Sequence, residues 1–313
     1  MTTVSMHELL SRAVTHHYAI GYYESWDLYS LEAALEAAEQ ANAPAILGFG
    51  GAVTSPEWLN SGGVERLAGL ARQMAERTRV PAAVLFNEGQ TIEQIVRALD
   101  AGCNAVMLDN SDLSFEENIV LTCRVVAAAK AVGASVEAEL GHLSDAIDTS
   151  QHAQLTDPAQ AAEFVERTGV DALAVSIGNM HLVMEGEVAV DLERLRHIGR
   201  AVGVPLVIHG GTGFPRAAVP GAIAAGVAKF NVGTRLKRLF LSGVRDAMPD
   251  PLQVRDIHPY VGSRERDDVM QCGKARLRAE IIELTKLYGS AGKADLYHSS
   301  AEEAVYVDQG TVA

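Results

Sequence analysis

The sequence predicts a (β/α)8 barrel, an α/β fold, with additional helices after the last strand. Eight short runs of apolar and β-branched residues recur along the 313 residues, and segments with the helical period separate them. Short runs without polar alternation are typical of strands buried on both faces, and eight strand–helix repeats close into a barrel. A doubly wound open sheet is the alternative, but it usually opens with a glycine-rich nucleotide fingerprint, which the first unit lacks.

The expected elements follow one another in a regular order. The predicted strands are residues 17–24, 43–50, 81–88, 103–110, 134–141, 171–178, 204–211 and 226–233. Crossover helices are clearest in SLEAALEAAEQAN and VERLAGLARQMAERT, and two more helical patterns, 235–248 and 275–289, follow the eighth strand. We expect one barrel domain over residues 1–292, C-terminal helices included, and a C-terminal arm over 293–313 that could be partly disordered.

Composition limits the classes of function. The chain is 48% hydrophobic and 21% charged, which suits one large core, and its net charge of -14 disfavours a nucleic-acid or anionic-membrane partner. Its three cysteines lie far apart without CxxC spacing, as in reduced cytoplasmic proteins. The first residues are polar, and no apolar run approaches the roughly 20 residues that span a bilayer. We therefore expect a soluble, unexported, cytoplasmic protein.

Polar residues gather where the predicted strands end. In a (β/α)8 barrel, the residues just past the C-terminal ends of the strands build the active site. Here those positions hold Glu24, Asp27, Asn87, Glu88, Asp109, Asp112, Glu137, Glu139, Asn179, His181, His209, Gly210, Gly211, Thr212, Gly213, Asn231, Gly233 and Thr234. Apolar runs that end in charged groups on one rim are hard to explain by folding alone, so we expect the functional site there.

Five of these segments resemble motifs of one enzyme family. DAGCNAVMLDNSDLSFEENI, SVEAELG, LAVSIGNMH, VIHGGTG and VAKFNVGT resemble, in order, motifs of the class II, metal-dependent ketose-bisphosphate aldolases, which include the fructose- and tagatose-bisphosphate aldolases. The resemblance runs from the first residues to about position 240. It implies a divalent-metal-dependent aldolase, a carbon–carbon lyase acting on a ketose phosphate or related sugar derivative through a metal-stabilised enediolate.

The implied metal site departs from the family at one ligand. The resemblance assigns His181 and His209 as ligands, but the family's HLDH sequence, whose last histidine is the third ligand, reads Leu85-Phe86-Asn87-Glu88 here. Two histidines and a carboxylate can still hold zinc or iron. Zinc is the expected ion. Because the carboxylate cancels one positive charge, harder ions such as manganese and iron are alternatives, and cobalt is a further one. A salt bridge without metal is the alternative role for Glu88.

Asn87 replaces the aspartate that, in the family, handles the proton on the substrate hydroxyl next to the bond being broken. A carboxamide cannot exchange a proton near neutral pH, so another acid has taken this role or the reaction has changed. Candidates on the rim are Glu24, Asp27, Asp109, Asp112 and Glu139. The resemblance places Asp109 and Glu139 at positions associated with an alternative metal site. The candidate catalytic residues are therefore Asn87, Glu88, Asp109 and Glu24, with Glu139 as a further metal-site residue.

Glycines after the seventh and eighth strands predict an anion site. Backbone N–H groups can approach an anion closely there, and phosphate sites of these barrels usually lie at this place. The positions that match family residues holding one phosphate and the adjacent ketose are Gly210, Gly211, Thr212, Asn231, Gly233 and Thr234. Tight turns that require glycine are the alternative. Leu182 replaces a family glycine, and its side chain would crowd that anion.

Two other functions remain open from the sequence. An isomerase or epimerase would form the same enediolate without bond cleavage, which the loss of the acid at Asn87 favours. A non-catalytic sugar-phosphate sensor or pseudoenzyme subunit would explain the clustered loss of the HLDH residues.

The loop after the fifth strand retains Asp145 and Asp148, either of which could be the acid of a mobile lid. The resemblance also implies a homodimer or homotetramer.

Overall fold

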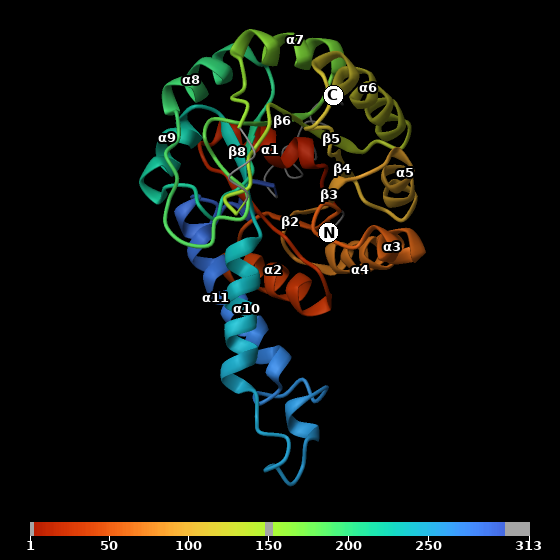
Figure 1. The fold of residues 1–313 in the computed structure, drawn as a ribbon, viewed down its shortest axis with the longest axis vertical. Coiled ribbons are helices and arrows are strands. Elements are labelled where there is room, and N and C mark those ends of the chain that lie inside the picture. The colour runs from red at the N-terminus through yellow and green to blue at the C-terminus, as the bar shows by residue number, and fades with distance from the viewer. Residues whose placement is uncertain (1–2, 148–152, 298–313) are drawn as a thin grey trace, which may run out of the picture.

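The computed structural model describes residues 3–147 and 153–297, and its strands close into a barrel (Figure 1). Neighbouring strands pair in parallel in the order of the sequence, and β8 pairs with β1. The strands are β1 (Ile20–Tyr23), β2 (Ala45–Gly50), β3 (Ala82–Gly89), β4 (Ala105–Leu108), β5 (Ser135–Leu140), β6 (Ala172–Val175), β7 (Leu206–Ile208) and β8 (Val227–Val232). The predicted (β/α)8 barrel is confirmed.

The barrel has a closed end and an open end. Inward side chains such as Tyr22 fill its interior, and helix α1 (Met6–Thr15) packs Leu9 against the same apolar cluster. The N–H of Val4 donates to the carbonyl of Ala82, the first residue of β3, at 2.9 Å. Each fully buried leucine stabilises the fold by about 1.5–3 kcal/mol. Helix α1 therefore closes the N-terminal end of the barrel and leaves the opposite end for the site.

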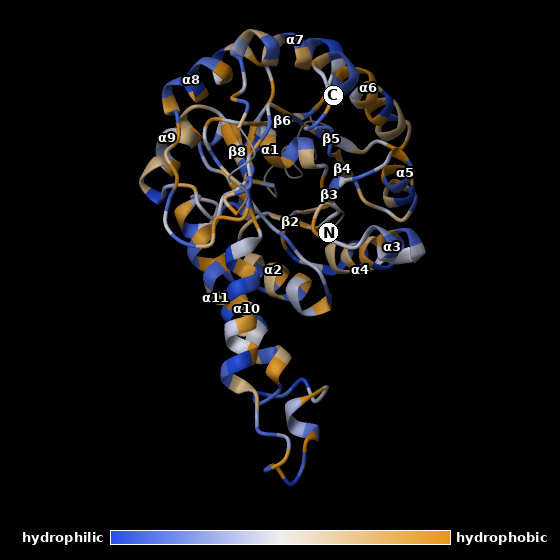
Figure 2. Ribbon diagram, viewed as in Figure 1, coloured by the Kyte–Doolittle hydropathy of each residue, from blue (hydrophilic) through white to orange (hydrophobic). Residues whose placement is uncertain are grey.

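Helices cover the outside of the barrel (Figure 1), and Figure 2 shows hydrophilic and hydrophobic residues on each of them. Between the strands lie α2 (Leu28–Ala41), α3 (Pro56–Trp58), η1 (Leu59–Gly63), α4 (Val64–Arg77), α5 (Ile92–Asp100), α6 (Phe115–Ala131), α7 (Pro158–Thr168), α8 (Leu192–Ala201), η2 (Arg216–Ala218) and α9 (Val219–Ala224). Within residues 3–147 and 153–297, no helix has both the length and the apolar character needed to cross a membrane.

Side chains at the strand–helix junctions begin several of these helices. A side-chain oxygen accepts from a backbone N–H of the first turn at Asp27, Thr91, Ser114, Asp157 and Asp191. Each such N-cap is worth about 1 kcal/mol. The caps fix where each helix starts and therefore how far each loop reaches over the open end of the barrel.

Two long helices follow the barrel and project beyond the ring of helices (Figure 1). Helix α10 (Thr234–Ala247) packs against α11 (Val269–Leu287), which also contacts α2, and η3 (His258–Tyr260) lies between them in the chain. The last described turn, η4 (Ala294–Tyr297), returns to the barrel, where the Arg12 side chain donates to the Leu296 carbonyl at 2.6 Å. The additional C-terminal helices are confirmed, and residues 298–313 of the expected arm lie outside the described residues.

Candidate active site

Glu88 lies at the open end of the barrel because β3 is distorted where it ends. The pairing of β3 with β4 shifts register between Phe86 and Gly89, and the φ angle of Glu88 is 53°. Left-handed backbone at a non-glycine residue is strained and clusters at functional sites. Gly51 permits the close packing, since a Cβ there would lie 2.3 Å from the Glu88 carbonyl oxygen. The irregularity re-aims the carboxylate of Glu88, as β-bulges commonly do next to active sites.

Two histidines face Glu88 from the loops after β6 and β7. His209 directly follows β7 and is 1% exposed, and His181 lies in the loop after β6. One candidate ligand atom from each of Glu88, His181 and His209 lies within 4.8 Å of the other two. Bonds of about 2.0–2.2 Å let one zinc ion join atoms about 4 Å apart, so small side-chain rotations would suffice. The structure thus brings these three sequence-predicted ligands together.

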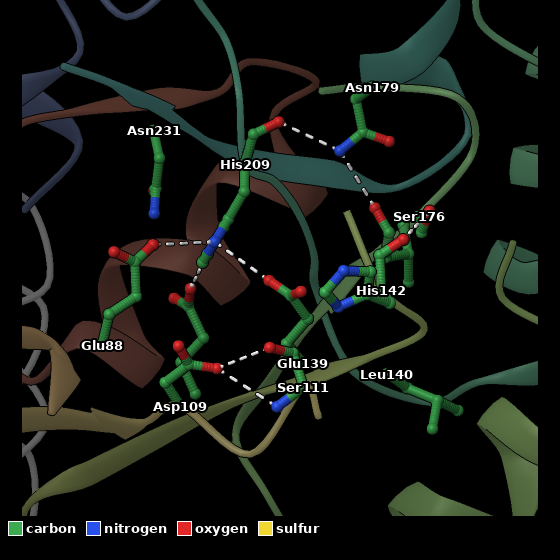
Figure 3. Close-up of polar contacts among 12 residues, drawn as sticks. Glu88, Asp109, Ser111, Glu139, Leu140, His142, Ser176, Asn179, His209 and Asn231 are labelled. Carbon is green, nitrogen blue, oxygen red and sulfur yellow. Dashed lines mark hydrogen bonds and ion pairs between the residues drawn. The ribbon is translucent and has the colours of Figure 1, made fainter. Parts of the chain in front are cut away.

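A buried chain of polar contacts fixes the ring of His209. Its Nε2 lies 3.0 Å from Glu137 Oε1, and Glu137 accepts from Lys229 Nζ at 2.8 and 3.0 Å. The Nδ1 atom therefore faces Glu88 Oε1 at 3.2 Å and Glu139 Oε2 at 3.1 Å (Figure 3). Nδ1 makes no hydrogen bond of good geometry within the described residues. A buried ring nitrogen that faces carboxylates without a well-aligned hydrogen bond is suited to bind a metal ion.

Carboxylates surround a cavity of about 310 Å³ beside these ligands. It lies over the ends of β3 to β6, and we call it the acidic cavity. Its polar lining consists of Glu88, Asp109, Ser111, Asp112, Glu139, His142, Asp145 and His181. Asp109 accepts from the hydroxyl of Ser111 at 2.8 Å, and Asp112 lies 3.6 Å from His142 Nδ1. Three of the candidate acids thus share one cavity; Asp148 lies outside the described residues.

The other two candidate acids, Glu24 and Asp27, already have partners outside the acidic cavity. Glu24 forms an ion pair with Lys237 Nζ at 3.0 Å. Its carboxylate lies against Gly233, where a Cβ would be 2.2 Å from Oε2. Asp27 caps helix α2, and its Oδ1 accepts from the N–H of Ser30 at 2.8 Å. Glu24 therefore remains a residue of the site, whereas Asp27 has a structural role.

The glycines after β7 and β8 line a second, smaller cavity next to Glu88 and His181. Gly210, Thr212, Gly233 and Thr234 line it, and we call these four residues the glycine cradle. The φ of Gly210 is 68°, and a Cβ there would lie 2.1 Å from the Met180 carbonyl oxygen, so glycine is required. Thr234 begins helix α10, whose N-terminus attracts anions. Gly211 differs from the cradle residues because its N–H donates to the Asn231 carbonyl at 2.8 Å.

Three buried polar atoms at the smaller cavity have no hydrogen-bond partner within residues 3–147 and 153–297. They are Tyr22 OH, Asn87 Oδ1 and Asn231 Nδ2, and we call their residues the polar floor. Lys229 Nζ donates to Asn231 Oδ1 at 2.7 Å, which leaves Nδ2 for another partner. A buried polar atom without a partner costs about 1–3 kcal/mol. These atoms therefore mark a place where polar groups of a ligand would bind.

Comparison with known proteins identifies the family. A family model described as class II fructose-bisphosphate aldolase matches residues 4–293. The chain belongs to the class II fructose-bisphosphate aldolase family. A fructose-bisphosphate aldolase of Geobacillus stearothermophilus is 34% identical over 298 residues, which are 94% of this chain and 99% of that protein. The crystal structure of the YdjI aldolase from Escherichia coli K12 matches with a TM-score of 0.77 and 33% identity, over 94% of this chain and 100% of that chain.

Membership of the class II aldolase family confirms three predictions from the strand-end motifs. These are the family resemblance itself, a lyase of the aldolase type that acts on sugar phosphates, and dependence on a divalent metal ion. A further relative, the fructose-bisphosphate aldolase of Staphylococcus aureus, is 36% identical and covers 89% of this chain. Together with the family match, the convergence of side chains makes one cluster the candidate metal site: Glu88, His181 and His209.

Sequence reasoning assigned no role to three residues of this class II aldolase site. Tyr22 lies on the polar floor, and Glu137 and Lys229 form the buried pair that orients His209. A lysine inside the apolar run GVAKFNVG was the available signal, because a fully buried lysine requires an anionic partner. Tyr22 gave no signal, since aromatic residues are common in buried strands.

The carboxylates around His209 favour its protonated form. Burial lowers the pKa of His209, but Glu137, Glu139 and Glu88 outweigh burial and raise the pKa well above 6.5. Burial raises the pKa of Glu88, but His209 and His181 outweigh it and lower the pKa to about 2. The protonated ring of His209 and the ionised carboxylate of Glu88 therefore stabilise each other.

We expect zinc loading at pH 7 to release about one proton, because the ion must displace the proton of His209. Apparent zinc affinity should rise by roughly tenfold per pH unit until the pH passes the pKa of His209. Calorimetric titration in buffers of different ionisation enthalpy measures the proton count. His258→Gln, a change at an exposed histidine on η3, is the matched control and should release the same number. Zinc binding without proton release would contradict the assigned protonation of His209.

Proposed function

We propose that this chain is a zinc-dependent aldolase that cleaves or forms a carbon–carbon bond in a ketose phosphate. The convergence of Glu88, His181 and His209, with His209 Nδ1 facing the carboxylates of Glu88 and Glu139, carries this proposal. These residues would hold the ion, with Glu139 as an additional oxygen ligand 3.1 Å from His209 Nδ1. Two histidines with a carboxylate suit zinc, and manganese, iron or cobalt would also fit. When bound, the ion supplies Lewis acidity that polarises a substrate carbonyl.

Asp109 is the residue that we assign to proton transfer at the substrate hydroxyl. Asn87 cannot exchange a proton near neutral pH, whereas Asp109 lines the acidic cavity with Glu88 and His181. Burial raises the pKa of Asp109, and this shift moves its carboxyl group toward the range useful for acid–base chemistry. Asn87 would position a substrate hydroxyl through its unpartnered Oδ1. Glu24 is the weaker candidate because Lys237 already pairs with it.

The glycine cradle would bind the phosphate of the ketose. Gly210 and Gly233 bring backbone to the cavity wall without a side chain, and Thr212 adds a hydroxyl. The N-terminus of α10 supplies the positive end of a helix dipole. Asn231 would bind the adjacent ketose through Nδ2, and Gly211 would shape the turn because its N–H is already used.

A substitution pair tests the aldol reaction and the role of Asp109. We expect the metal-loaded wild type to cleave a ketose phosphate, and Asp109→Asn to lower kcat by about 100-fold, a typical effect of removing an acid–base group. Asn87→Asp should change kcat by less than about tenfold if Asp109 carries the proton. The assay is release of the three-carbon ketose phosphate from a panel of ketose phosphates. Cleavage that appears only in Asn87→Asp would instead favour an isomerase or epimerase as the native activity.

We also propose that the enzyme is a cytoplasmic homodimer or homotetramer. Leu241, Leu252 and Val261, in the projecting segment of α10 and the chain that follows it, are 64, 94 and 63% exposed. An interface between subunits over this segment would cover these side chains. The free thiols of Cys103 and Cys123 support a reducing compartment.

A further inference from the structure

The two sides of the barrel mouth differ in charge. The carboxylates of Glu88, Asp109, Asp112 and Glu139 line the acidic cavity beside Asp145, and its lining within residues 3–147 and 153–297 contains no lysine or arginine. A divalent ion would offset two of these four negative charges, so negative charge remains in the cavity. An anionic group placed in this cavity would therefore be repelled.

The side near the glycine cradle contains the basic residues. Arg216 and Arg235 line a neighbouring cavity together with Thr212 and Glu187, and Arg235 pairs with Glu280 at 2.6 Å, so Arg216 and the N-terminus of α10 supply the positive charge nearest to the cradle. Lys237, one turn into α10, neutralises Glu24 at 3.0 Å, so the carboxylate nearest to Gly233 does not act as an isolated charge. A phosphate is thus favoured at the cradle and opposed on the other side of the metal ligands.

The polar floor, which lines the smaller cavity together with the glycine cradle, consists of uncharged groups. The unpartnered atoms are a phenol oxygen on Tyr22, an amide oxygen on Asn87 and an amide nitrogen on Asn231. Tyr22 and Asn231 are partners in the β1–β8 register, so their side chains are neighbours on the inner face. Neutral donors and acceptors of this kind match sugar hydroxyl and carbonyl groups. They provide the second, independent indication of a polyol ligand.

We propose that the substrate carries a single phosphate, held at the glycine cradle, and that the half of it in the acidic cavity is an uncharged polyol. This inference rests on the proposed aldolase function and narrows its substrate class to ketose monophosphates. It implies that a ketose 1,6-bisphosphate is a poor ligand, because its second phosphate would enter the acidic cavity. Asp112 and its neighbours are then specificity-determining residues.

Binding of compounds that cannot be cleaved tests the inference separately from catalysis. D-glucitol 1-phosphate and D-glucitol 1,6-bisphosphate lack the carbonyl group, and the D-mannitol pair covers a second configuration. Calorimetry on the zinc-loaded protein should show the monophosphate binding at least about tenfold more tightly than the bisphosphate, as expected for like charges brought together. This ratio should fall in high salt, since salt screens exposed charges such as Asp112.

A charge reversal in the acidic cavity locates the effect. The Asp112 side chain is 92% exposed, so Asp112→Lys should fold normally. It should lower the monophosphate preference by about three- to tenfold. Glu193→Lys, the same charge change on the exposed face of α8, is the matched control and should leave the ratio unchanged.

Equal or tighter binding of the bisphosphate would overturn the inference, as would failure of all four compounds to bind. A monophosphate preference in a protein that cleaves no ketose phosphate would support the inference on ligand class and overturn the proposed aldol reaction. Cleavage of bisphosphates in preference to monophosphates would support the proposed aldol reaction and overturn the inference on ligand class.

Discussion

Glu88→Ala is expected to abolish stoichiometric metal binding and to lower kcat/KM by more than about 100-fold. Loss of groups that merely support a ligand commonly costs 10- to 100-fold in metal affinity, so loss of a ligand should cost more. Glu88 is also held in strained, left-handed backbone at the end of β3, which indicates that its position serves function rather than packing. Elemental analysis of purified protein, wild type beside variant and without added metal, measures the effect.

Two further variants separate metal binding from folding. Glu88→His should retain metal, because a third imidazole can occupy the same place among His181 and His209. Glu193→Ala, a change at an exposed glutamate on α8, should retain the metal content of the wild type. Wild-type protein that stays metal-free after incubation with zinc, or full metal content in Glu88→Ala, would contradict the assignment of Glu88 as a ligand.

The sequence predicts the barrel well because its signal is repetitive and local. Each of the eight predicted runs contains a strand, since short apolar segments between helical segments have few other solutions. The ends of strands are less predictable. The run VPLVIHGG yields only Leu206–Ile208 as β7, because Pro205 has no N–H for the ladder and Gly210 has left-handed backbone.

The candidate site is predictable where barrel topology alone gathers residues, and less so where side-chain contacts decide. Glu88, His181 and His209 end three different strands or loops on one rim, so their convergence follows from the fold. Asp27 stands on the same rim, but Ser30 three residues later makes it a helix cap. The contact between Glu137 and Lys229 joins β5 to β8 across the barrel interior, and no spacing in the sequence encodes that distance.

Lys229→Met is expected to lower the free energy of unfolding by about 3–5 kcal/mol, as when one partner of a buried ion pair is removed. Glu137 would remain buried with His209 as its remaining cationic neighbour. In the wild type, burial raises the pKa of Glu137, but Lys229 and His209 outweigh it, and the pKa is lowered. Without Lys229 the pKa of Glu137 should rise, so the variant should lose most stability well above pH 4.5 and less in acid, where the carboxyl group is protonated. Urea unfolding at pH 5 and pH 8 measures this difference.

Removing both charges distinguishes a role in folding from a role at the metal site. Lys229→Met combined with Glu137→Gln removes both charges of the pair, so it should recover much of the stability lost in the single variant. An amide oxygen at position 137 still accepts a hydrogen bond from His209 Nε2 but lacks the charge that makes the ring a strong ligand, so zinc affinity should stay about 10- to 100-fold below the wild type. Lys286→Met, at an exposed lysine of α11, should change stability by less than about 0.5 kcal/mol. A double variant with wild-type zinc affinity would show that the pair only stabilises the barrel. A double variant that is no more stable than Lys229→Met would show that the buried charge of Glu137 does not cause the loss of stability.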